Sequence, residues 1–143
     1  MDHVVYVDAK ENEMERLLSG EKTMILRGAA GRKLPYDRIH EGETLYLINN
    51  NAEGCVKAIA NVKRVIQSGK MTREESFQML DDFQSGLQLS PAQQKRWGGK
   101  RFIVIMELDQ VQEIEPIPID KSDYGNMDDW LPVGSIDSVR SKL

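Results

Sequence analysis

Lys22, Thr23 and Arg27 lie close together in the sequence, and their side chains are of types that handle anions. The planar guanidinium of an arginine can hold a phosphate or a carboxylate through two parallel hydrogen bonds, and a lysine supplies a compact positive charge. A threonine hydroxyl can hydrogen-bond a ligand, or attack a carbonyl when a neighbouring base takes its proton. We therefore predict that these three residues bind a ligand. No catalytic residue is assigned, and Lys22 and Thr23 are the candidates for such a role.

Each of these three residues also has an ordinary structural interpretation. A lysine directly after a helix is favourable because cations stabilise a helix C-terminus. Arg27 can be a surface charge at the end of a strand, and Thr23 can fill a strand position without touching a ligand. The residue types leave both interpretations open at all three positions.

A long loop is predicted after Arg27, because glycine and proline recur among polar residues over 28–42. Loops of this length in compact domains are often functional. The loop carries one aromatic and three basic side chains: Arg32, Lys33, Tyr36 and Arg38. Such a mixture can stack on a nucleotide and neutralise its charge. Basic loops also serve solubility, so these four residues are candidates for binding and do not form a defined motif.

The elements that must position these residues are a strand, a helix and a second strand. Residues 3–7 are mostly β-branched or aromatic, which favours a strand. Asp8 is expected to cap the following helix, with Glu11 in the capping-box position. Gly20 is expected to end the helix, because glycine readily adopts a positive φ. The second strand is then expected at 23–27.

The rest of the chain adds strands, a helical insert and a polar tail. Strands are expected at 44–48, 55–66 and 102–108, helices after Thr72 (with Glu75 in the capping box) and after Ser90, and an edge strand or extended segment at 111–119, where prolines interrupt the isoleucines. Beyond residue 120, four side chains are expected to anchor a tail: Tyr124, Met127, Trp130 and Leu131. This order lacks the regular alternation of a doubly wound sheet, and it predicts an α+β fold in which helices flank a mixed barrel or curled sheet.

Length and composition predict one domain covering 1–143, with its core at about 3–115 and a tail at 120–143. The single cysteine, Cys55, excludes an internal disulfide. Because no secretory signal is recognised at the N-terminus, a cytoplasmic location is expected. The longest apolar runs are too short to cross a membrane.

The net charge of −4 and the pI near 5.2 limit the class of partner. A protein that grips long duplex nucleic acid through its phosphates usually has a basic balance, which this chain lacks. Its bases gather instead in three runs, at 27–38, 63–70 and 95–101. Runs that meet at one cleft would suit a short anionic ligand, whereas separate runs would be solvated faces.

Neither a metal site nor a cofactor is predicted, and the oligomeric state stays open. His3 and His40 are the two imidazoles of the chain, and neither lies in a ligand pattern. Cys55 has no histidine near it in sequence, which favours a buried thiol over a nucleophile. The chain contains no phosphate-binding loop or dinucleotide fingerprint. The acids at 74–82 are typical of a solvent-facing helix, although one of them can serve as a general base.

Two motifs resemble the ASCH family of PUA-like domains. Residues 18–27 (Leu-Ser-Gly-Glu-Lys-Thr-Met-Ile-Leu-Arg) are similar to its Gly-x-Lys-Thr turn followed by a strand that ends in arginine, and 41–47 are similar to its Gly-Asp/Glu-x-hydrophobic strand start. The later elements follow in the family's order, so the resemblance covers about 3–115. It implies a PUA-like mixed β-barrel with flanking helices and a cleft beside Lys22 and Arg27.

The resemblance also implies a class of ligand. ASCH proteins are associated with RNA and coactivator complexes, and small bacterial members hydrolyse acetylated cytidine. In those amidohydrolases the motif's second threonine is the nucleophile, the lysine activates it and a later glutamate assists. This chain has Ile25 at the nucleophile position, and an isoleucine has no hydroxyl to attack a carbonyl. Where the glutamate is expected, at 82–86, the polar residues are Asp82, Gln84 and Ser85.

Three functions stay open on these grounds. The leading hypothesis is a protein that binds RNA or a modified nucleoside or nucleotide, with Lys22 and Arg27 supplying positive charge and Thr23 and the loop completing the pocket. The second is a small amidohydrolase for an acylated nucleoside, in which Lys22 lowers the pKa of Thr23 or of a water and an acid from 74–82 assists. The third is a protein-interaction adaptor that uses the acidic C-terminal segment.

Overall fold

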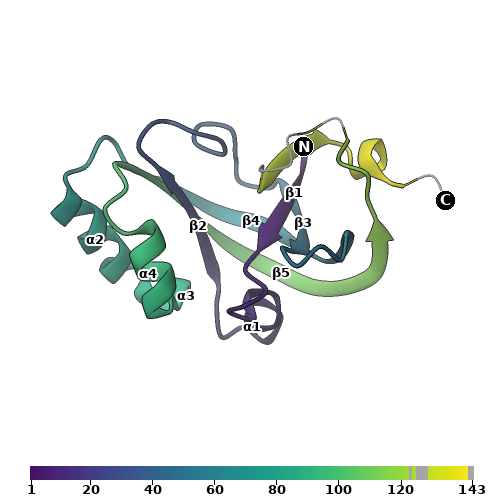
Figure 1. Ribbon diagram of the computed structural model, residues 1–143, viewed down its shortest axis with the longest axis horizontal. Helices are drawn as coiled ribbons and strands as arrows, with labels where there is room; N and C mark the ends of the chain where they lie inside the picture. Colours follow the sequence, from purple (N-terminus) through teal and green to yellow (C-terminus); the bar gives the residue numbers. More distant parts are fainter. Residues whose placement is uncertain (123, 125–128, 142–143) are drawn as a thin grey trace.

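One mixed sheet of six strands, in the order β2-β5-β4-β3-β1-β6, organises the part of the chain that the computed structural model describes, residues 1–122, 124 and 129–141 (Figure 1). The sheet curls into a half-barrel. Its strands are β1 (Asp2–Val7), β2 (Met24–Ala29), β3 (Thr44–Asn49), β4 (Cys55–Gln67), β5 (Phe102–Pro118) and β6 (Trp130–Gly134). The helices are α1 (Glu13–Ser19), α2 (Arg73–Asp82), α3 (Gln84–Leu87), α4 (Pro91–Trp97) and the 3-10 helix η1 (Ile136–Val139). The predicted α+β fold with a curled mixed sheet is confirmed.

β4 and β5 form a long antiparallel ribbon in the sheet. β2 pairs with the first part of β5, from Phe102 to Glu107. Beyond that point β5 continues to Pro118, and within the described residues its one strand partner there is β4. The segment predicted at 111–119 is thus the outer part of β5 rather than a separate strand. It does lie at an edge, where a proline without an N–H donor is tolerated.

Helix α1 begins later than the sequence pattern indicates. The predicted cap at Asp8 is wrong, because the chain first makes a turn and the helix starts after Asn12, which has a positive φ of 53°. The Glu13 side chain reaches back and accepts a hydrogen bond from the backbone N–H of Asp8 at 3.1 Å. The Asp8 carboxylate accepts from the backbone N–H of Glu11 in the turn before the helix, at 3.4 Å from Oδ1, and its Oδ2 faces α4. Gly20 ends the helix with a φ of 82°, as predicted.

Helices α2, α3 and α4 form an insert between β4 and β5 at one end of the half-barrel (Figure 1). α2 begins with the predicted capping box between Thr72 and Glu75. α4 begins with a second capping box, between Ser90 and Gln93. Apolar side chains of the insert, Leu87 among them, pack against β2 and β5, which places α4 beside β2. Among the described helices, none combines the length and the apolar character needed to cross a bilayer.

The main core lies inside the half-barrel, between the sheet and α1. Ile25 belongs to this core and is 1% exposed, in a cluster that includes Leu17 and Met106. Because side chains alternate along a strand, Arg27 lies on the same face of β2 as Ile25. Ile25 is therefore a packing residue, and Arg27 stands where that core face reaches the open side of the half-barrel.

The segment expected to be an anchored tail contains a further strand. Residues 130–134 form β6, which pairs antiparallel with β1. Trp130 and Leu131 are buried as the anchor prediction requires, and Tyr124 packs against the same cluster as Leu131, whereas Met127 lies outside the described residues. The sequence does not reveal this strand because it is short and contains Pro132.

Candidate ligand-binding cleft

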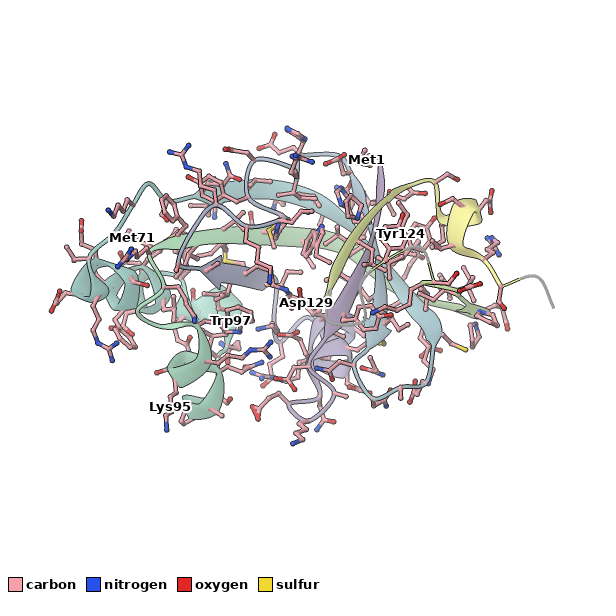
Figure 2. The ribbon with its side chains drawn as sticks, turned by 45° about the horizontal axis from the view of Figure 1, so that its top comes forward. Met1, Met71, Lys95, Trp97, Tyr124 and Asp129 are labelled. Atoms are coloured by element: carbon pink, nitrogen blue, oxygen red, sulfur yellow. The ribbon has the colours of Figure 1, made fainter. Side chains whose placement is uncertain are left out.

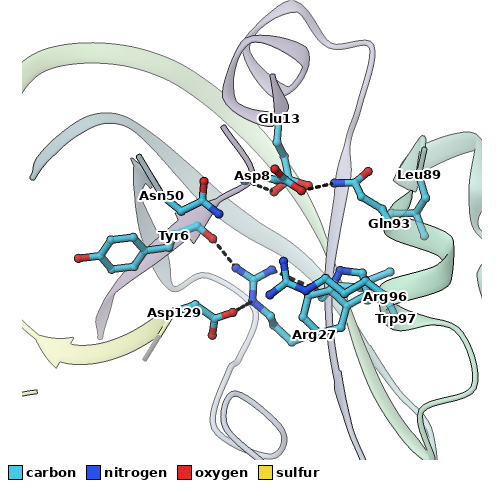
Figure 3. A pocket seen from close by; sticks show the side chains of 11 residues that line it. Tyr6, Asp8, Glu13, Arg27, Asn50, Leu89, Gln93, Arg96, Trp97 and Asp129 are labelled. Atoms are coloured by element: carbon cyan, nitrogen blue, oxygen red, sulfur yellow. Dashed lines mark hydrogen bonds and ion pairs between the residues drawn. The ribbon is translucent and has the colours of Figure 1, made fainter. Parts of the chain in front are cut away.

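A cleft opens where the two ends of the curled sheet approach each other, with β2 on one side, β1 and the start of β6 on the other, and α4 as a third wall. Its inner part is a hollow of about 50 Å³ (Figure 3). The polar and aromatic residues that line it include Asp8, Glu13, Arg27, Gln93, Trp97 and Asp129. They come from segments far apart in the sequence, which explains why no single motif contains them.

Arg27 crosses the opening of the half-barrel. Its guanidinium donates to the backbone carbonyl of Tyr6, with Nη2 2.6 Å from the oxygen, and to that of Leu26, with Nη1 at 2.8 Å. Its Nε lies 3.3 Å from Oδ2 of Asp129, an ion pair whose geometry does not make a hydrogen bond. The residue is 9% exposed. Arg27 therefore joins the two ends of the sheet and holds a fixed positive charge in the wall of the cleft.

An aromatic ring and two guanidinium groups form the side of the cleft nearest α4. The Cζ atom of Arg27 lies 5.8 Å from the ring centroid of Trp97, and that of Arg96 lies 4.5 Å from it. Both distances allow cation–π attraction. Trp97 is half-buried, and Arg96 is exposed. A planar ligand can reach this ring by displacing the Arg96 guanidinium, or it can stack on the guanidinium itself.

Oxygen acceptors form the side of the cleft nearest α1 (Figure 3). The Gln93 amide donates to Oδ2 of Asp8 at 3.4 Å, so the two side chains lie together. In the described part of the chain Asp8 forms no ion pair, and its carboxylate can accept hydrogen bonds from a ligand. The same part of the chain holds no group of three His, Cys, Asp or Glu side chains placed to bind a metal ion.

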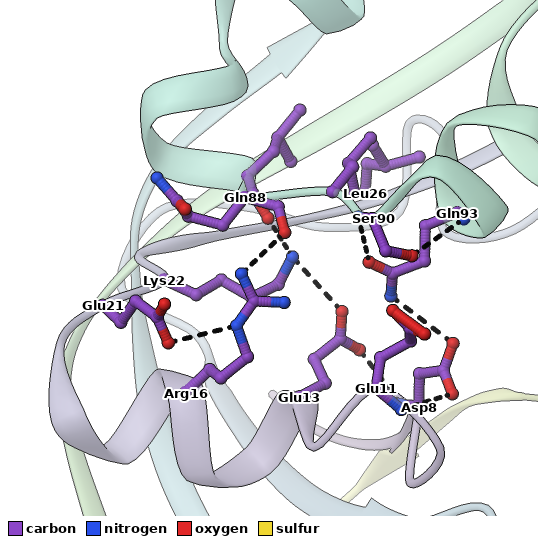
Figure 4. A network of polar contacts seen from close by, with 12 residues as sticks. Asp8, Glu11, Glu13, Arg16, Glu21, Lys22, Leu26, Gln88, Ser90 and Gln93 are labelled. Atoms are coloured by element: carbon purple, nitrogen blue, oxygen red, sulfur yellow. Dashed lines mark hydrogen bonds and ion pairs between the residues drawn. The ribbon is translucent and has the colours of Figure 1, made fainter.

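Lys22 lies behind this acceptor wall and outside the hollow (Figure 4). Its side chain is 1% exposed, its Nζ lies 3.3 Å from Oε2 of Glu13, and it donates to the backbone carbonyl of Leu87. Burial lowers the pKa of Lys22 below its usual value, although the carboxylate of Glu13 acts in the opposite direction. Of the predicted pair of cations, Arg27 lines the cleft directly and Lys22 reaches it through Glu13.

The cleft widens outward into a second hollow of about 220 Å³. This outer hollow shares Arg27, Arg96, Trp97 and Asp129 with the inner one, and Figure 2 labels the last two of these residues. Lys33 from the loop after β2 and Lys100 from the turn before β5 also line it. Of the four loop residues expected to bind a ligand, Lys33 is thus placed at the cleft.

Comparison with known proteins identifies the architecture. No family model matches the chain, and no curated protein matches it either. The crystal structure of ASCH from Zymomonas mobilis is similar, with a TM-score of 0.66 and 16% identity over 90% of this chain and 85% of that chain. A crystal structure of a mutant of that protein gives a TM-score of 0.62 and 18% identity over 82% and 73% of the two chains. The chain has an ASCH-type fold. The resemblance stated from the two sequence motifs is thereby confirmed for the fold.

The ASCH-type fold places Thr23 away from the cleft. Thr23 is exposed, and together with the stem of Lys22 it lines a different hollow, of about 240 Å³, between α1 and the middle of β5. The two residues are neighbours in sequence, but the Nζ of Lys22 is engaged by Glu13 and Leu87. The turn that carries the motif therefore contributes a buried lysine that pairs with Glu13 behind the cleft, and no hydroxyl to the cleft itself.

Two of the remaining loop residues, Arg32 and Tyr36, have partners of their own in the ASCH-type fold. The Arg32 guanidinium lies over the rings of Tyr36 and Phe102, at 5.9 and 5.6 Å from their centroids. The hydroxyl of Tyr36 donates to the backbone carbonyl of Ser68. Arg38 is exposed, and none of Arg32, Tyr36 and Arg38 lines the inner or outer hollow. Much of the loop's aromatic and basic character therefore serves to fix the loop on the sheet.

Sequence reasoning missed most of the groups that line this cleft. Asp8 has the features of a helix cap, and Gln93 is an ordinary residue of a helical pattern. The one available signal is Trp97, which is followed by two glycines. A Cβ atom at Gly98 would lie 2.1 Å from the ring of Phe77, so a glycine is needed there for α4 to end against α2.

Proposed function

We propose that this ASCH-type protein binds a nucleoside or nucleotide, free or within RNA and with a base that can carry a modification, in the cleft between β2, α4 and the turn before α1. The observation that supports this most directly is the half-buried ring of Trp97 beside the fixed guanidinium of Arg27, facing the Asp8 carboxylate across a hollow. Aromatic rings and guanidinium planes stack on bases, and carboxylates accept hydrogen bonds from their amino groups.

The size of the cleft supports a single nucleotide unit. Ligand pockets for small molecules usually hold about 300 to 1,000 Å³. The inner hollow of about 50 Å³ is too small alone, but it continues into the outer hollow of about 220 Å³. Together they are close to the lower end of that range. The net charge of −4 likewise favours a short ligand over long duplex nucleic acid.

A calorimetric titration with the four ribonucleosides and their 5′-monophosphates, and with short single-stranded RNA, tests this proposal. We expect binding by at least one of them, weakened about 10-fold or more by Trp97→Leu and by Asp8→Asn, since stacking and base-edge contacts are each worth about 1–3 kcal/mol. Arg38→Gln is the matched control, because this exposed residue lies outside both hollows. Circular dichroism confirms that each variant is folded. No binding by any of these ligands, or equal weakening by Arg38→Gln, would contradict the proposal.

A small amidohydrolase is the second candidate, and the Lys22–Glu13 pair favours it, because the Glu13 carboxylate lines the hollow and can take a proton from a water as a general base. The acids predicted to assist do not line the cleft, and Glu74, Glu75 and Asp82 are exposed on α2. A base in this site would therefore act through Glu13 on a water. Acetate release from N-acylated nucleosides that disappears in Glu13→Gln would support hydrolysis, and no release by the unmodified protein would exclude it for these substrates.

Two further predictions from the sequence stay proposals. A cytoplasmic location is supported by a single cysteine, Cys55, which the structure shows as a free, half-buried thiol. The adaptor function was assigned to the acidic C-terminal segment, and residues 123 and 125–128 of that segment lie outside the described residues.

A further inference from the structure

We infer that the outer hollow of the cleft is a phosphate subsite, formed by Lys33, Arg96 and Lys100. This inference rests on the proposed function and deepens it. It specifies that the ligand carries a phosphate attached to its nucleoside, as a nucleotide or a nucleotide residue of RNA does, and is not a free nucleoside.

The first argument is the state of the cations along the cleft. The inner cations are already neutralised, because Arg27 lies 3.3 Å from Asp129 and Lys22 lies 3.3 Å from Glu13. The outer cations differ. Within the described residues, the side chains of Lys33, Arg96 and Lys100 form no ion pair, and all three are exposed. They are therefore available to an anion.

The second argument is that three separate segments bring these cations to one place. Lys33 belongs to the loop after β2, Arg96 to the last turn of α4 and Lys100 to the turn before β5, and all three line the same hollow. Basic side chains that serve only solubility do not need to meet at one place. Basic side chains that bind a phosphate do, since each phosphate oxygen can accept charge-assisted hydrogen bonds from a different side chain.

The third argument is the packing that places Lys100. A Cβ atom built on Gly28 would lie 3.2 Å from the Cβ of Lys100 and 3.2 Å from Cγ1 of Ile103, closer than ordinary contact. The lack of a side chain at Gly28 therefore lets the stem of Lys100 lie against β2 at the floor of the outer hollow.

The two hollows share Arg27, Arg96, Trp97 and Asp129, and they differ in the residues that line only one of them, which gives the ligand a direction. Asp8, Glu13 and Gln93 line only the inner hollow, and Lys33 and Lys100 line only the outer one. A base with an amino group suits the inner end, stacked at Trp97, with its phosphate in the outer hollow. The Cζ atom of Arg96 lies 4.5 Å from the centroid of the Trp97 ring, and its exposed side chain can move to the phosphate when a base takes that place.

The experiment compares each ribonucleoside with its 5′-monophosphate by calorimetry at one fixed ionic strength. We expect the monophosphate to bind at least 10-fold more tightly than the nucleoside. Lys33→Gln and Lys100→Gln should each reduce the affinity for the monophosphate about 3- to 10-fold and leave the affinity for the nucleoside unchanged. Lys95→Gln is the matched control, because Lys95 is an exposed cation of the same helix as Arg96 and lines neither hollow. It should change neither affinity.

The outcomes separate this inference from the proposed function. Equal affinity for nucleoside and monophosphate, or an equal loss in Lys95→Gln, would overturn the phosphate subsite and leave nucleoside binding intact. If no nucleoside or monophosphate binds, the proposed function fails. A titration with inorganic phosphate then tests the subsite separately. Weak phosphate binding that is lost in Lys33→Gln would still support the subsite, and no phosphate binding would exclude it. A dinucleotide and a 3′-monophosphate, titrated in parallel, distinguish RNA from free nucleotide as the source of the phosphate.

Discussion

At the scale of single residues, the ion pair between Lys22 and Glu13 is the main difference between what the motif suggests and what the structure contains. Both side chains are nearly inaccessible, at 1% and 8% exposure. Two charges out of water are costly unless they neutralise each other. Lys22 is bound by Glu13 and by the carbonyl of Leu87, and is therefore first a structural residue whose effect on a ligand passes through Glu13.

This pair leads to a prediction for stability. Glu13→Leu leaves the Lys22 ammonium buried without a counter-charge and should lower the free energy of unfolding by about 3 kcal/mol. The double variant Glu13→Leu/Lys22→Met removes both charges and should be clearly more stable than the single variant. Urea denaturation measures both. A single variant that loses less than about 1 kcal/mol, or a double variant less stable than the single one, would show that the pair is not neutralised as described.

Arg27 shows what sequence spacing can and cannot predict at this scale. Its place on the core face of β2 follows from the alternation of side chains, so its role at the cleft was accessible from the sequence. The burial of Lys22 was not, because it depends on where α1 lies relative to the helical insert. The role of Gln93 was equally unpredictable from the sequence, because its amide contacts Asp8, 85 residues earlier, and a local sequence pattern contains no information on such a contact.

At the scale of elements, β6 is held to β1 by a buried histidine. Nε1 of Trp130 donates to Nδ1 of His3 at 3.0 Å, so the His3 proton is on Nε2, which lies 3.3 Å from Oε1 of Glu43. The fully buried imidazole is neutral in this arrangement. A second proton on Nδ1 would remove the acceptor that Trp130 needs, and the link between the two strands would be lost.

Stability should therefore fall on mild acidification. Burial lowers the pKa of His3 below 6.5, although Glu43 and Asp2 raise it and the N-terminal amine acts with burial. The unfolded chain then takes up the proton first, so the contribution of His3 is complete above about pH 6.5 and is lost as pH falls from there through the lowered pKa. For one titrating group, the free energy of unfolding changes by at most about 1.4 kcal/mol per pH unit. Urea denaturation between pH 7.5 and 5 measures it. His3→Gln should abolish this slope.

Helix α4 connects folding to the cleft through its capping box. Ser90 caps the helix with Gln93, whose amide nitrogen also donates to Asp8 in the acceptor wall. Ser90→Ala should cost about 1 kcal/mol of stability and weaken ligand binding, because it removes the hydroxyl that caps the first turn of α4 and so loosens the turn that carries Gln93. Thr72→Ala removes the equivalent cap of α2 and should cost a similar free energy without affecting binding. Equal effects of the two variants on affinity would contradict this link.

At the element scale most of the fold was predictable, and the failures have physical causes. β4, the two capped helices and the inner part of β5 follow from alternation and capping signals in the sequence. α1 starts later than predicted because Asn12 takes a left-handed conformation that no residue type requires. β6 was not predicted because it pairs with β1, a strand far away in the sequence, and such a contact produces no periodic pattern in the local sequence.

At the scale of the whole molecule, an acidic protein contains a locally basic groove. The net charge of −4 disfavours long polyanions, while the exposed cations of the outer hollow stand at a mouth leading to carboxylates. This distribution is what a short ligand with unlike ends requires. The likeness to ASCH structures at 16% identity extends over 90% of the chain and describes the shape of the scaffold. The charged residues that line its cleft are known from this sequence and structure alone, not from that likeness.

The guanidinium that spans the gap between β2 and β1 has a consequence for the scaffold itself. Among the described strands, β2 does not pair with β1 or β6, so the half-barrel is open there. The Arg27 side chain links β2 to β1 across this opening. Because Arg27 also lines the inner hollow, ligand binding and the contacts that join β2 to β1 are thermodynamically coupled, and each changes the free energy of the other by the same amount. A ligand that alters the contacts of Arg27 therefore alters the stability of the half-barrel.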